Sequence, residues 1–286
     1  MLWKLSVLTW AFEAARPGFG PLQTRGARMT TEEAIRQIAE MGFDAVELVI
    51  WNIEDFPKIR RQKIKEELES LDLEMVNICC NDNVYVWSGP VYTNPDESVR
   101  RSIVQRIKQE IEAAVEWDCK CIGIWPGSDP IPPKIPYWDA WNYLVDTISE
   151  CAKVAEDHGV QIALEYKPEN MLNNVDSTLR ILKEVNSDNV GALLDTGHAI
   201  VAREHLPTAA EMLNGKLFHI HIDDNYGDWD RDLPPGTAHN FKPFLEALKR
   251  VRYKGCLSMD VWPYEDAHKE IKMGKEYLEK LMREIG

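Results

Sequence analysis

Short apolar runs alternate with longer amphipathic stretches along the whole of this 286-residue chain. Eight of the runs have the length and the apolar content that strands favour. They cover residues 3–10, 44–50, 74–80, 119–125, 160–167, 190–195, 216–223 and 255–262. An amphipathic stretch follows each run, and we expect helices over residues 30–42, 58–70, 97–117, 137–158, 176–186, 206–214, 240–252 and 266–285.

Eight strand-then-helix units in succession restrict the topology that the chain can adopt. Each strand can lie parallel to the next one through a right-handed helical crossover, and closing the sheet removes its two open edges. We therefore predict an α/β protein with a single-domain (β/α)8 TIM barrel that covers residues 1–286. A doubly wound open sheet is the main alternative, but no GxGxxG turn follows the first strand.

The charge balance narrows the choice of partners. The chain has 47 acidic and 33 basic residues, for a formal net charge of −14. Such a chain repels polyanions, so we expect no nucleic-acid partner. No apolar stretch approaches the roughly 20 residues of a membrane span, so we expect no membrane partner either. A small neutral molecule is the easier ligand.

The cysteines and the N-terminal segment bear on the compartment. The six cysteines form no CxxC pair and lie mostly in strand-like runs, so we expect reduced core thiols and a cytoplasmic protein. The segment "MLWKLSVLTWAFEAA" faintly resembles a secretion signal, but its apolar run is short and Glu13 interrupts it. We expect this segment to form the first strand.

Each of the last four predicted strands carries, at or near its end, a residue that could bind a metal ion. These residues are Glu165, Asp195, His221 and Asp260. The carboxyl ends of all strands in a closed parallel barrel meet at one mouth, so the four side chains could surround a single ion. Three carboxylates and one imidazole suit Mn²⁺, Mg²⁺ or Co²⁺, and Zn²⁺ is also possible. His219 lies one layer deeper, where we expect a hydrogen-bonded core histidine.

Five motifs, in this order and spacing, resemble those of the xylose isomerase-like TIM-barrel superfamily. They are "GFDAVEL" (42–48), "ALEYKP" (163–168), "LLDTGH" (193–198), "HIHIDD" (219–224) and "GCLSMDVW" (255–262). The superfamily includes xylose isomerases, ketose 3-epimerases, inosose isomerases and dehydratases, hydroxypyruvate isomerases and apurinic endonucleases. The resemblance covers essentially the whole chain. It implies that Glu165, Asp195, His221 and Asp260 are metal ligands and that His198 contacts the substrate.

Two positions distinguish between members of the superfamily. The element "LEYKP" is closer to the Glu-x-Lys-Pro element of xylose isomerases than to the epimerase version, which lacks the lysine. This likeness implies that Lys167 points at a substrate oxygen and helps the metal to polarise it. Ketose 3-epimerases end the eighth strand in a glutamate that acts as a second base. Here the residue is Asp260, one methylene shorter, which weakens the two-base mechanism.

The expected chemistry is proton transfer next to a carbonyl group. A metal that bridges adjacent carbonyl and hydroxyl oxygens acidifies the neighbouring C–H, and Glu165 could remove that proton to form an enediolate. Asp260 and Lys167 are the other expected catalytic residues. Return of the proton gives isomerisation or epimerisation, and loss of hydroxide gives dehydration. A hydride shift is the alternative if a second ion binds near His198 and the acidic loop 223–232, which we otherwise expect to be a solvated lid.

Aromatic residues at the strand ends suggest a carbohydrate substrate, because aromatic rings pack against the C–H face of a sugar. The tryptophans at these ends are Trp10, Trp51, Trp125 and Trp262. We expect Trp125 and Trp262 to contact substrate, with Arg231 as a polar contact. Glu47 could orient substrate or a ligand, or form a structural ion pair. No glycine-rich phosphate cradle follows strands seven and eight, which favours a neutral sugar.

These observations together predict a divalent-metal-dependent isomerase or epimerase that acts on a neutral sugar or a polyol-derived ketone, with Mn²⁺ as the expected ion. A homo-oligomer is a further expectation, by analogy alone. The alternatives are a metal-dependent lyase (a keto-inositol dehydratase or a carbon-glycoside cleaving subunit), an apurinic endonuclease and a non-catalytic sugar binder. Long insertions after strands one, three and four, over residues 11–29, 81–96 and 126–136, are expected to choose the substrate.

Overall fold

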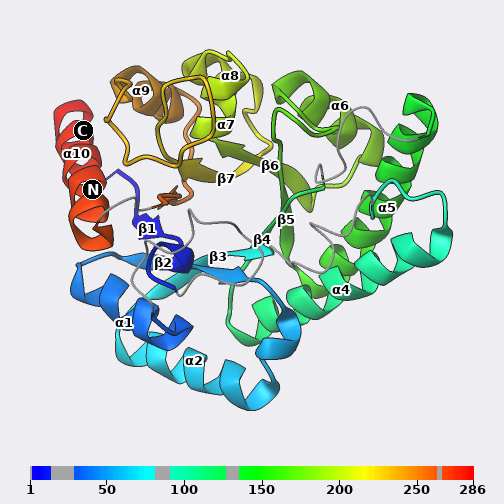
Figure 1. The fold of residues 1–286 in the computed structure, drawn as a ribbon, viewed down its shortest axis with the longest axis horizontal. Coiled ribbons are helices and arrows are strands. Elements are labelled where there is room, and N and C mark those ends of the chain that lie inside the picture. Colours follow the sequence, from blue (N-terminus) through cyan, green and yellow to red (C-terminus); the bar gives the residue numbers. More distant parts are fainter. Residues whose placement is uncertain (1, 14–28, 81–90, 127–134, 263–265) are drawn as a thin grey trace.

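The computed structural model describes residues 2–13, 29–80, 91–126, 135–262 and 266–286 (Figure 1). Most of the three insertions that we expect to choose the substrate therefore lies outside the described residues. The remainder of the chain includes all eight expected strands and the helices that follow them.

Eight parallel strands form one sheet that curls into a barrel. They are β1 (Leu5–Val7), β2 (Ala45–Ile50), β3 (Glu74–Cys80), β4 (Cys121–Ile124), β5 (Gln161–Glu165), β6 (Val190–Asp195), β7 (Leu217–Ile222) and β8 (Leu257–Met259). Each strand pairs with its sequence neighbour, and β1 pairs with β8. A parallel bridge between Leu8 and Glu47 joins the two remaining edges. The predicted TIM barrel is confirmed, and the open doubly wound sheet is wrong.

The helices form a ring outside the strands (Figure 1). They are α1 (Thr31–Glu40), α2 (Lys58–Ser70), α4 (Glu97–Glu116), α5 (Tyr137–His158), α6 (Val175–Val185), α7 (Thr196–Val201), α8 (Leu206–Met212), α9 (Lys242–Arg250) and α10 (Ala267–Ile285), with short 3-10 turns η1 (Thr9–Ala11) and η3 (Ile53–Asp55). The expected helices lie within a few residues of these bounds. The short helix α7, which begins directly at the end of β6, is an addition that the sequence pattern does not predict.

Local sequence signals account for where several helices begin and end. The Thr30 side chain accepts a hydrogen bond from the backbone N–H of Glu33, whose carboxylate accepts one from the N–H of Thr30. Such a capping box satisfies backbone groups that the first turn leaves unpaired, and a good N-cap stabilises a helix by about 1 kcal/mol. Helix α5 ends at His158 and is capped by Gly159, whose φ of +64° is the left-handed conformation that glycine adopts without strain.

Burial of the strands on both faces explains their nearly continuous apolar sequences, because helices cover the outside while side chains fill the barrel. Every residue of β2 and β6 is buried, and these include the carboxylates of Glu47 and Asp195. A charged group is buried only where hydrogen bonds and opposite charges compensate its lost hydration. The positions of these two residues therefore indicate polar networks inside the barrel.

Two irregularities in strand pairing aim polar side chains at one another. In the β2–β3 pair the register shifts by one residue after Val46, so that Glu47 lies beside Asn77. In the β6–β7 pair a shift after Ala192 places Asp195 beside His221. Such bulges commonly re-aim side chains near active sites. The fold thus uses its two register shifts to assemble the polar centre of the barrel.

All six cysteines are buried and free, in agreement with the expectation of core thiols. Burial raises the pKa of each thiol for which a shift is resolved, for example that of Cys119 to about 12. None of the helices in the described part of the chain has the length and apolar character needed to cross a bilayer.

Candidate metal centre and active site

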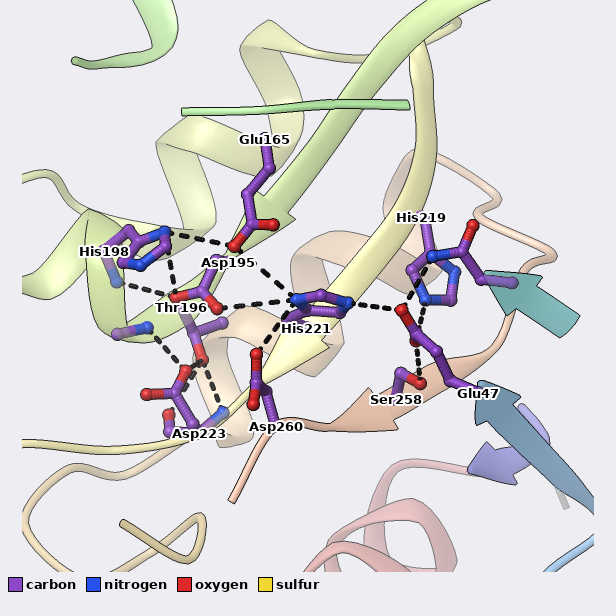
Figure 2. A network of polar contacts seen from close by, with 12 residues as sticks. Glu47, Glu165, Asp195, Thr196, His198, His219, His221, Asp223, Ser258 and Asp260 are labelled. Carbon is purple, nitrogen blue, oxygen red and sulfur yellow. Dashed lines mark hydrogen bonds and ion pairs between the residues drawn. The ribbon is translucent and has the colours of Figure 1, made fainter. Parts of the chain in front are cut away.

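The four residues expected to bind metal meet at the carboxyl ends of β5 to β8 (Figure 2). Glu165, Asp195, His221 and Asp260 each offer one ligand atom, and these atoms all lie within 4.8 Å of one another. The imidazole lies at the centre of the group. Its Nδ1 atom is 3.6 Å from Glu165 Oε1, 3.7 Å from Asp195 Oδ2 and 3.2 Å from Asp260 Oδ2. All four side chains are buried.

The unsatisfied polar atoms of this cluster fit a divalent metal ion. Among the described residues, Glu165 Oε1, His221 Nδ1 and Asp260 Oδ1 are buried without a hydrogen-bond partner, which is costly for polar groups. Burial and the carboxylates of Asp195 and Glu165 raise the pKa of Asp260 to about 7, although His221 opposes the shift. A cation bound among these atoms would relieve this crowding of like charges, and the oxygen-rich donor set suits a hard ion.

Asp195 belongs to both the metal cluster and helix α7. Its Oδ1 atom accepts a hydrogen bond of 2.7 Å from the backbone N–H of His198, so Asp195 is the N-cap of the helix. Gly197 is required here because a Cβ atom would lie 2.0 Å from Asp223 Oδ2. The sequence "DTGH" therefore starts a helix and delivers two polar side chains to the mouth in a single turn.

His198 connects the metal cluster to the acidic loop after β7. Its Nδ1 atom lies 3.3 Å from Glu165 Oε1, and its Nε2 atom lies 3.0 Å from Asp230 Oδ2. Burial lowers the pKa of His198, but the carboxylates of Asp195 and Asp230 outweigh it and raise the pKa to about 9. His198 thus supplies positive charge next to the cluster.

Lys167 lies on the other side of Asp230. Its Nζ atom is 2.9 Å from Asp230 Oδ2 and 5.4 Å from the centroid of the Trp125 ring. The indole N–H of Trp125 donates a hydrogen bond to Glu165. His198 and Lys167 hold the pKa of Asp230 well below its usual range, although burial opposes this. Asp230 is therefore an anion shared by two cations, a position that the sequence analysis did not single out.

The acidic loop 223–232 is not uniformly solvated, and the expectation of a solvated lid is wrong for its first residues. Asp223, Asp224 and Asn225 are fully buried, whereas the aromatic rings of Tyr226 and Trp229 are exposed. Asp223 accepts hydrogen bonds from the hydroxyl of Thr196 and from the N–H of Gly197. The loop therefore packs onto α7 and carries Asp230 to the mouth.

Asp224 anchors the far end of this loop. Its Oδ2 atom accepts hydrogen bonds from the backbone N–H groups of Ala238 and His239, at 2.7 and 2.9 Å. Its Oδ1 atom lies 2.7 Å from His239 Nδ1 and accepts from the N–H of Asn225. A backbone pair with Leu233 completes the closure. These bonds hold the two ends of the loop segment 224–233 together, and Asp230 lies within this segment.

Two further groups have the composition of a second ion site. Ligand atoms of Asp195, His198 and Asp230 lie within 4.8 Å of one another, as do those of Asp223, Asp230 and Asp232. Burial raises the pKa values of Asp223 and Asp232 well above their usual range, and neighbouring carboxylates add to the shift. The ammonium of Lys167 already supplies one positive charge at Asp230.

The remaining candidates for substrate contact are three tryptophans and Arg231, and they lie in two separate parts of the structure. Trp10 lies between Trp51 and Trp262, with ring centroids 6.1 and 5.1 Å away, so these three strand-end residues form one aromatic wall. Arg231 pairs with Asp228 at 2.8 Å and lies over the exposed Tyr226 ring. In these contacts Arg231 faces the outer part of the loop.

Glu47 lies on the side of the His221 ring that faces away from Glu165 and Asp195 (Figure 2). It is fully buried and accepts a hydrogen bond of 2.9 Å from Nε2 of His221 and one of 2.7 Å from Nε2 of His219. The expected substrate contact does not fit this position, because the carboxylate is surrounded by protein donors. The alternatives that Glu47 orients a ligand or forms a structural ion pair both fit it. His219 is, as expected, a hydrogen-bonded core histidine.

Comparison with known proteins agrees with this fold. Residues 35–281 match the family described as xylose isomerase-like TIM barrel. Protein MJ1311 of Methanocaldococcus jannaschii is 32% identical over 260 residues, which cover 86% of this chain and 84% of that protein. The chain therefore belongs to the xylose isomerase-like TIM-barrel family.

Relatives with named activities extend this assignment. An inosose isomerase of Bacillus subtilis is 28% identical over 183 residues, which cover 60% of this chain and 64% of the relative. The crystal structure of a D-tagatose 3-epimerase-like protein superposes with a TM-score of 0.80 at 26% identity. The aligned residues cover 99% of this chain and 100% of that protein's chain. A structure of IOLI protein with a bound zinc atom has a TM-score of 0.78 at 19% identity, with 99% of both chains covered. The chain is an enzyme of the isomerase and epimerase class.

The anchoring of the loop by Asp224 can be tested with Asp224→Asn. An amide at this position would point its NH₂ group either at the two backbone N–H groups of Ala238 and His239 or at the N–H of Asn225, so we expect the free energy of unfolding to fall by about 2 kcal/mol. Urea denaturation measures this change. The matched control is Asp228→Asn in the same loop, whose exposed carboxylate pairs with Arg231. The control should unfold close to wild type, and equal losses in the two variants would contradict the anchoring role.

Proposed function

We propose that this enzyme is a divalent-metal-dependent isomerase or epimerase of a neutral sugar or a polyol-derived ketone. The observation that carries the proposal is the convergence of three buried carboxylates and one imidazole at the barrel mouth, with unpartnered ligand atoms facing one another. The inosose isomerase and the 3-epimerase-like protein among the relatives support the same class of reaction.

Glu165, Asp195, His221 and Asp260 would hold the ion. When bound, it would supply Lewis-acid polarisation of the substrate's carbonyl and hydroxyl oxygens. We propose Mn²⁺ because three of the four ligands are carboxylates. The zinc atom in the structure of IOLI protein supports a divalent ion and keeps zinc as the second choice.

Protein groups around the cluster are arranged for proton transfer. Trp125 donates a hydrogen bond to Glu165 and so orients its carboxylate. In our proposal Glu165 takes the proton from the carbon next to the carbonyl group, leaving an enediolate, and Lys167 donates a hydrogen bond to the oxygen that gains charge. Return of the proton to the neighbouring carbon, with transfer of the hydroxyl proton to the former carbonyl oxygen, completes an isomerisation. Delivery of a second proton, from Asp260, to the opposite face of the same carbon completes an epimerisation.

The charges at the mouth favour a neutral substrate. Asp230 pairs with both Lys167 and His198. Arg231 pairs with Asp228. Each of these three cationic side chains is therefore already paired with a carboxylate. A phosphorylated sugar would meet an excess of negative charge, which opposes binding. In our proposal the partly exposed rings of Trp10 and Trp262 pack against the C–H face of an uncharged sugar.

An apurinic endonuclease is less well supported. That reading needs further histidine ligands after the second and third strands, and the first histidine of this chain is His158. The formal net charge of −14 also disfavours binding to a DNA backbone.

The metal site predicts the ion content of the purified protein. Wild-type protein supplied with Mn²⁺ and then desalted should retain one equivalent by mass spectrometry, whereas Asp195→Ala should retain little, because a ligand and the N-cap of α7 are lost together. Mn²⁺ should also raise the melting temperature of the wild-type protein but not that of the Asp195→Ala variant. A wild-type protein that binds no divalent ion would contradict the proposal.

The proton-transfer role of Glu165 predicts isotope exchange. Wild-type enzyme incubated in D₂O with ketoses, aldoses and inososes should introduce deuterium into a C–H bond of its substrate, as seen by NMR or mass spectrometry. Glu165→Gln should reduce turnover and exchange by at least about 100-fold while the protein still unfolds cooperatively, because the amide cannot accept the proton. Turnover near the wild-type rate in this variant would remove Glu165 as the base.

Lys167 should serve the reaction more than the binding of the ion. Lys167→Met keeps the length of the side chain but removes the charge, so we expect kcat to fall by about 100-fold while Mn²⁺ content is retained. Lys272→Met, at an exposed position of α10, is the control for loss of a lysine. Loss of the ion together with activity would show instead that Lys167 maintains the charge balance of the site.

A further inference from the structure

We propose that Glu47 is a positioning residue, which fixes the orientation and tautomer of His221 and thereby sets the affinity of the site for a divalent ion. This inference rests on the proposed metal-dependent function. Glu47 lies on β2, three strands along the barrel wall from β5, the first of the strands that carry the ligands. It touches none of the carboxylate ligands in the contacts described above.

The two carboxylate oxygens of Glu47 have separate tasks. Oε1 accepts hydrogen bonds from Nε2 of His221, at 2.9 Å, and from the amide of Asn77, at 2.7 Å. Oε2 accepts from Nε2 of His219, at 2.7 Å, and from the hydroxyl of Ser258. Four donors thus surround a buried carboxylate, which compensates for its lost hydration. The bond to His221 can therefore be tested apart from the bonds on Oε2.

The contact with Glu47 determines which nitrogen of His221 can bind a cation. An ionised carboxylate accepts but does not donate, so Nε2 must carry a hydrogen. A neutral imidazole then presents its lone pair at Nδ1, the atom that faces Glu165, Asp195 and Asp260. A carboxylate behind a metal-binding imidazole also increases its basicity as a ligand. The amide of Asn77 and the hydroxyl of Ser258 donate to the two oxygens of Glu47, an arrangement that fits an ionised carboxylate.

The surrounding strands hold Glu47 in this position. The register shift between β2 and β3 places it beside Asn77. The amide of Asn77 in turn needs Gly123 on β4, because a Cβ atom there would lie 2.9 Å from Asn77 Nδ2. The bridge between Leu8 and Glu47 is the point at which the barrel closes. Several departures from a regular barrel therefore converge on this one carboxylate.

Mn²⁺ affinity of the metal-free protein tests the inference without any substrate. Glu47→Gln should weaken Mn²⁺ binding by about 10- to 100-fold in competition with a fluorescent chelator, because it removes the charge behind His221. The matched control is Ser258→Ala, which removes a donor to Oε2 and leaves the bond from His221 to Oε1 in place. The control should bind Mn²⁺ within about threefold of wild type, since its change does not touch the metal-binding imidazole.

Further measurements separate positioning from a general loss of stability. Urea unfolding of both metal-free variants reports their stability, and ¹⁵N NMR of His221 reports which nitrogen carries the hydrogen. Glu47→Asp, which keeps the charge but withdraws it by one methylene, serves if Glu47→Gln does not fold, and it too should weaken Mn²⁺ binding.

Equal Mn²⁺ affinity in the Glu47→Gln and Ser258→Ala variants would overturn the inference and leave the proposed function intact. A wild-type protein without Mn²⁺ affinity would overturn both. Weaker binding in the Glu47 variant, with the Ser258 variant close to wild type, would support the positioning role.

Discussion

Mutual repulsion between buried carboxylates is the constraint on which the rest of this site depends. Glu165, Asp195 and Asp260 approach one imidazole from three strands, and burial leaves little water to screen them. A proton on Asp260, whose pKa is raised, or positive charge from the protein or an ion relieves this repulsion. His198 and Lys167 supply part of the positive charge, and both share the carboxylate of Asp230. The unpartnered atoms at the centre of the cluster account for the proposal of a metal ion there.

The same residues serve the fold and the site, which explains why the barrel tolerates so much buried charge. Asp195 caps helix α7 while it faces His221, and Asp223 fastens the following loop to that helix. Glu47 gathers hydrogen bonds from three other strands. The hydrogen bonds to Asp195, Asp223 and Glu47 also hold strands and loops in register. The polar network is for this reason part of the core of the barrel.

The sequence predicted the strand ends better than the contacts between loops. Periodicity located Glu165, Asp195, His221 and Asp260, because parallel strands of similar length deliver their last residues to one place. The role of Asp230 was missed, since it depends on a loop that folds back over α7. The solvated lid was wrong for residues 223–225, whose burial comes from Thr196, Gly197 and a distant turn at residues 238–239. No spacing in the sequence reports such contacts.

The sequence by itself determined the alternation of strands and helices, hence the closed parallel barrel, and the chemical character of its mouth. These features follow from local hydrophobic patterns and from rules of strand connection that need no long-range detail. The tertiary structure decided the rest. A register shift of one residue places Asp195 beside His221, and another turns Glu47 toward the back of the same imidazole. Register depends on side-chain packing between strands, so only the folded barrel could show which nitrogen of His221 faces the carboxylates.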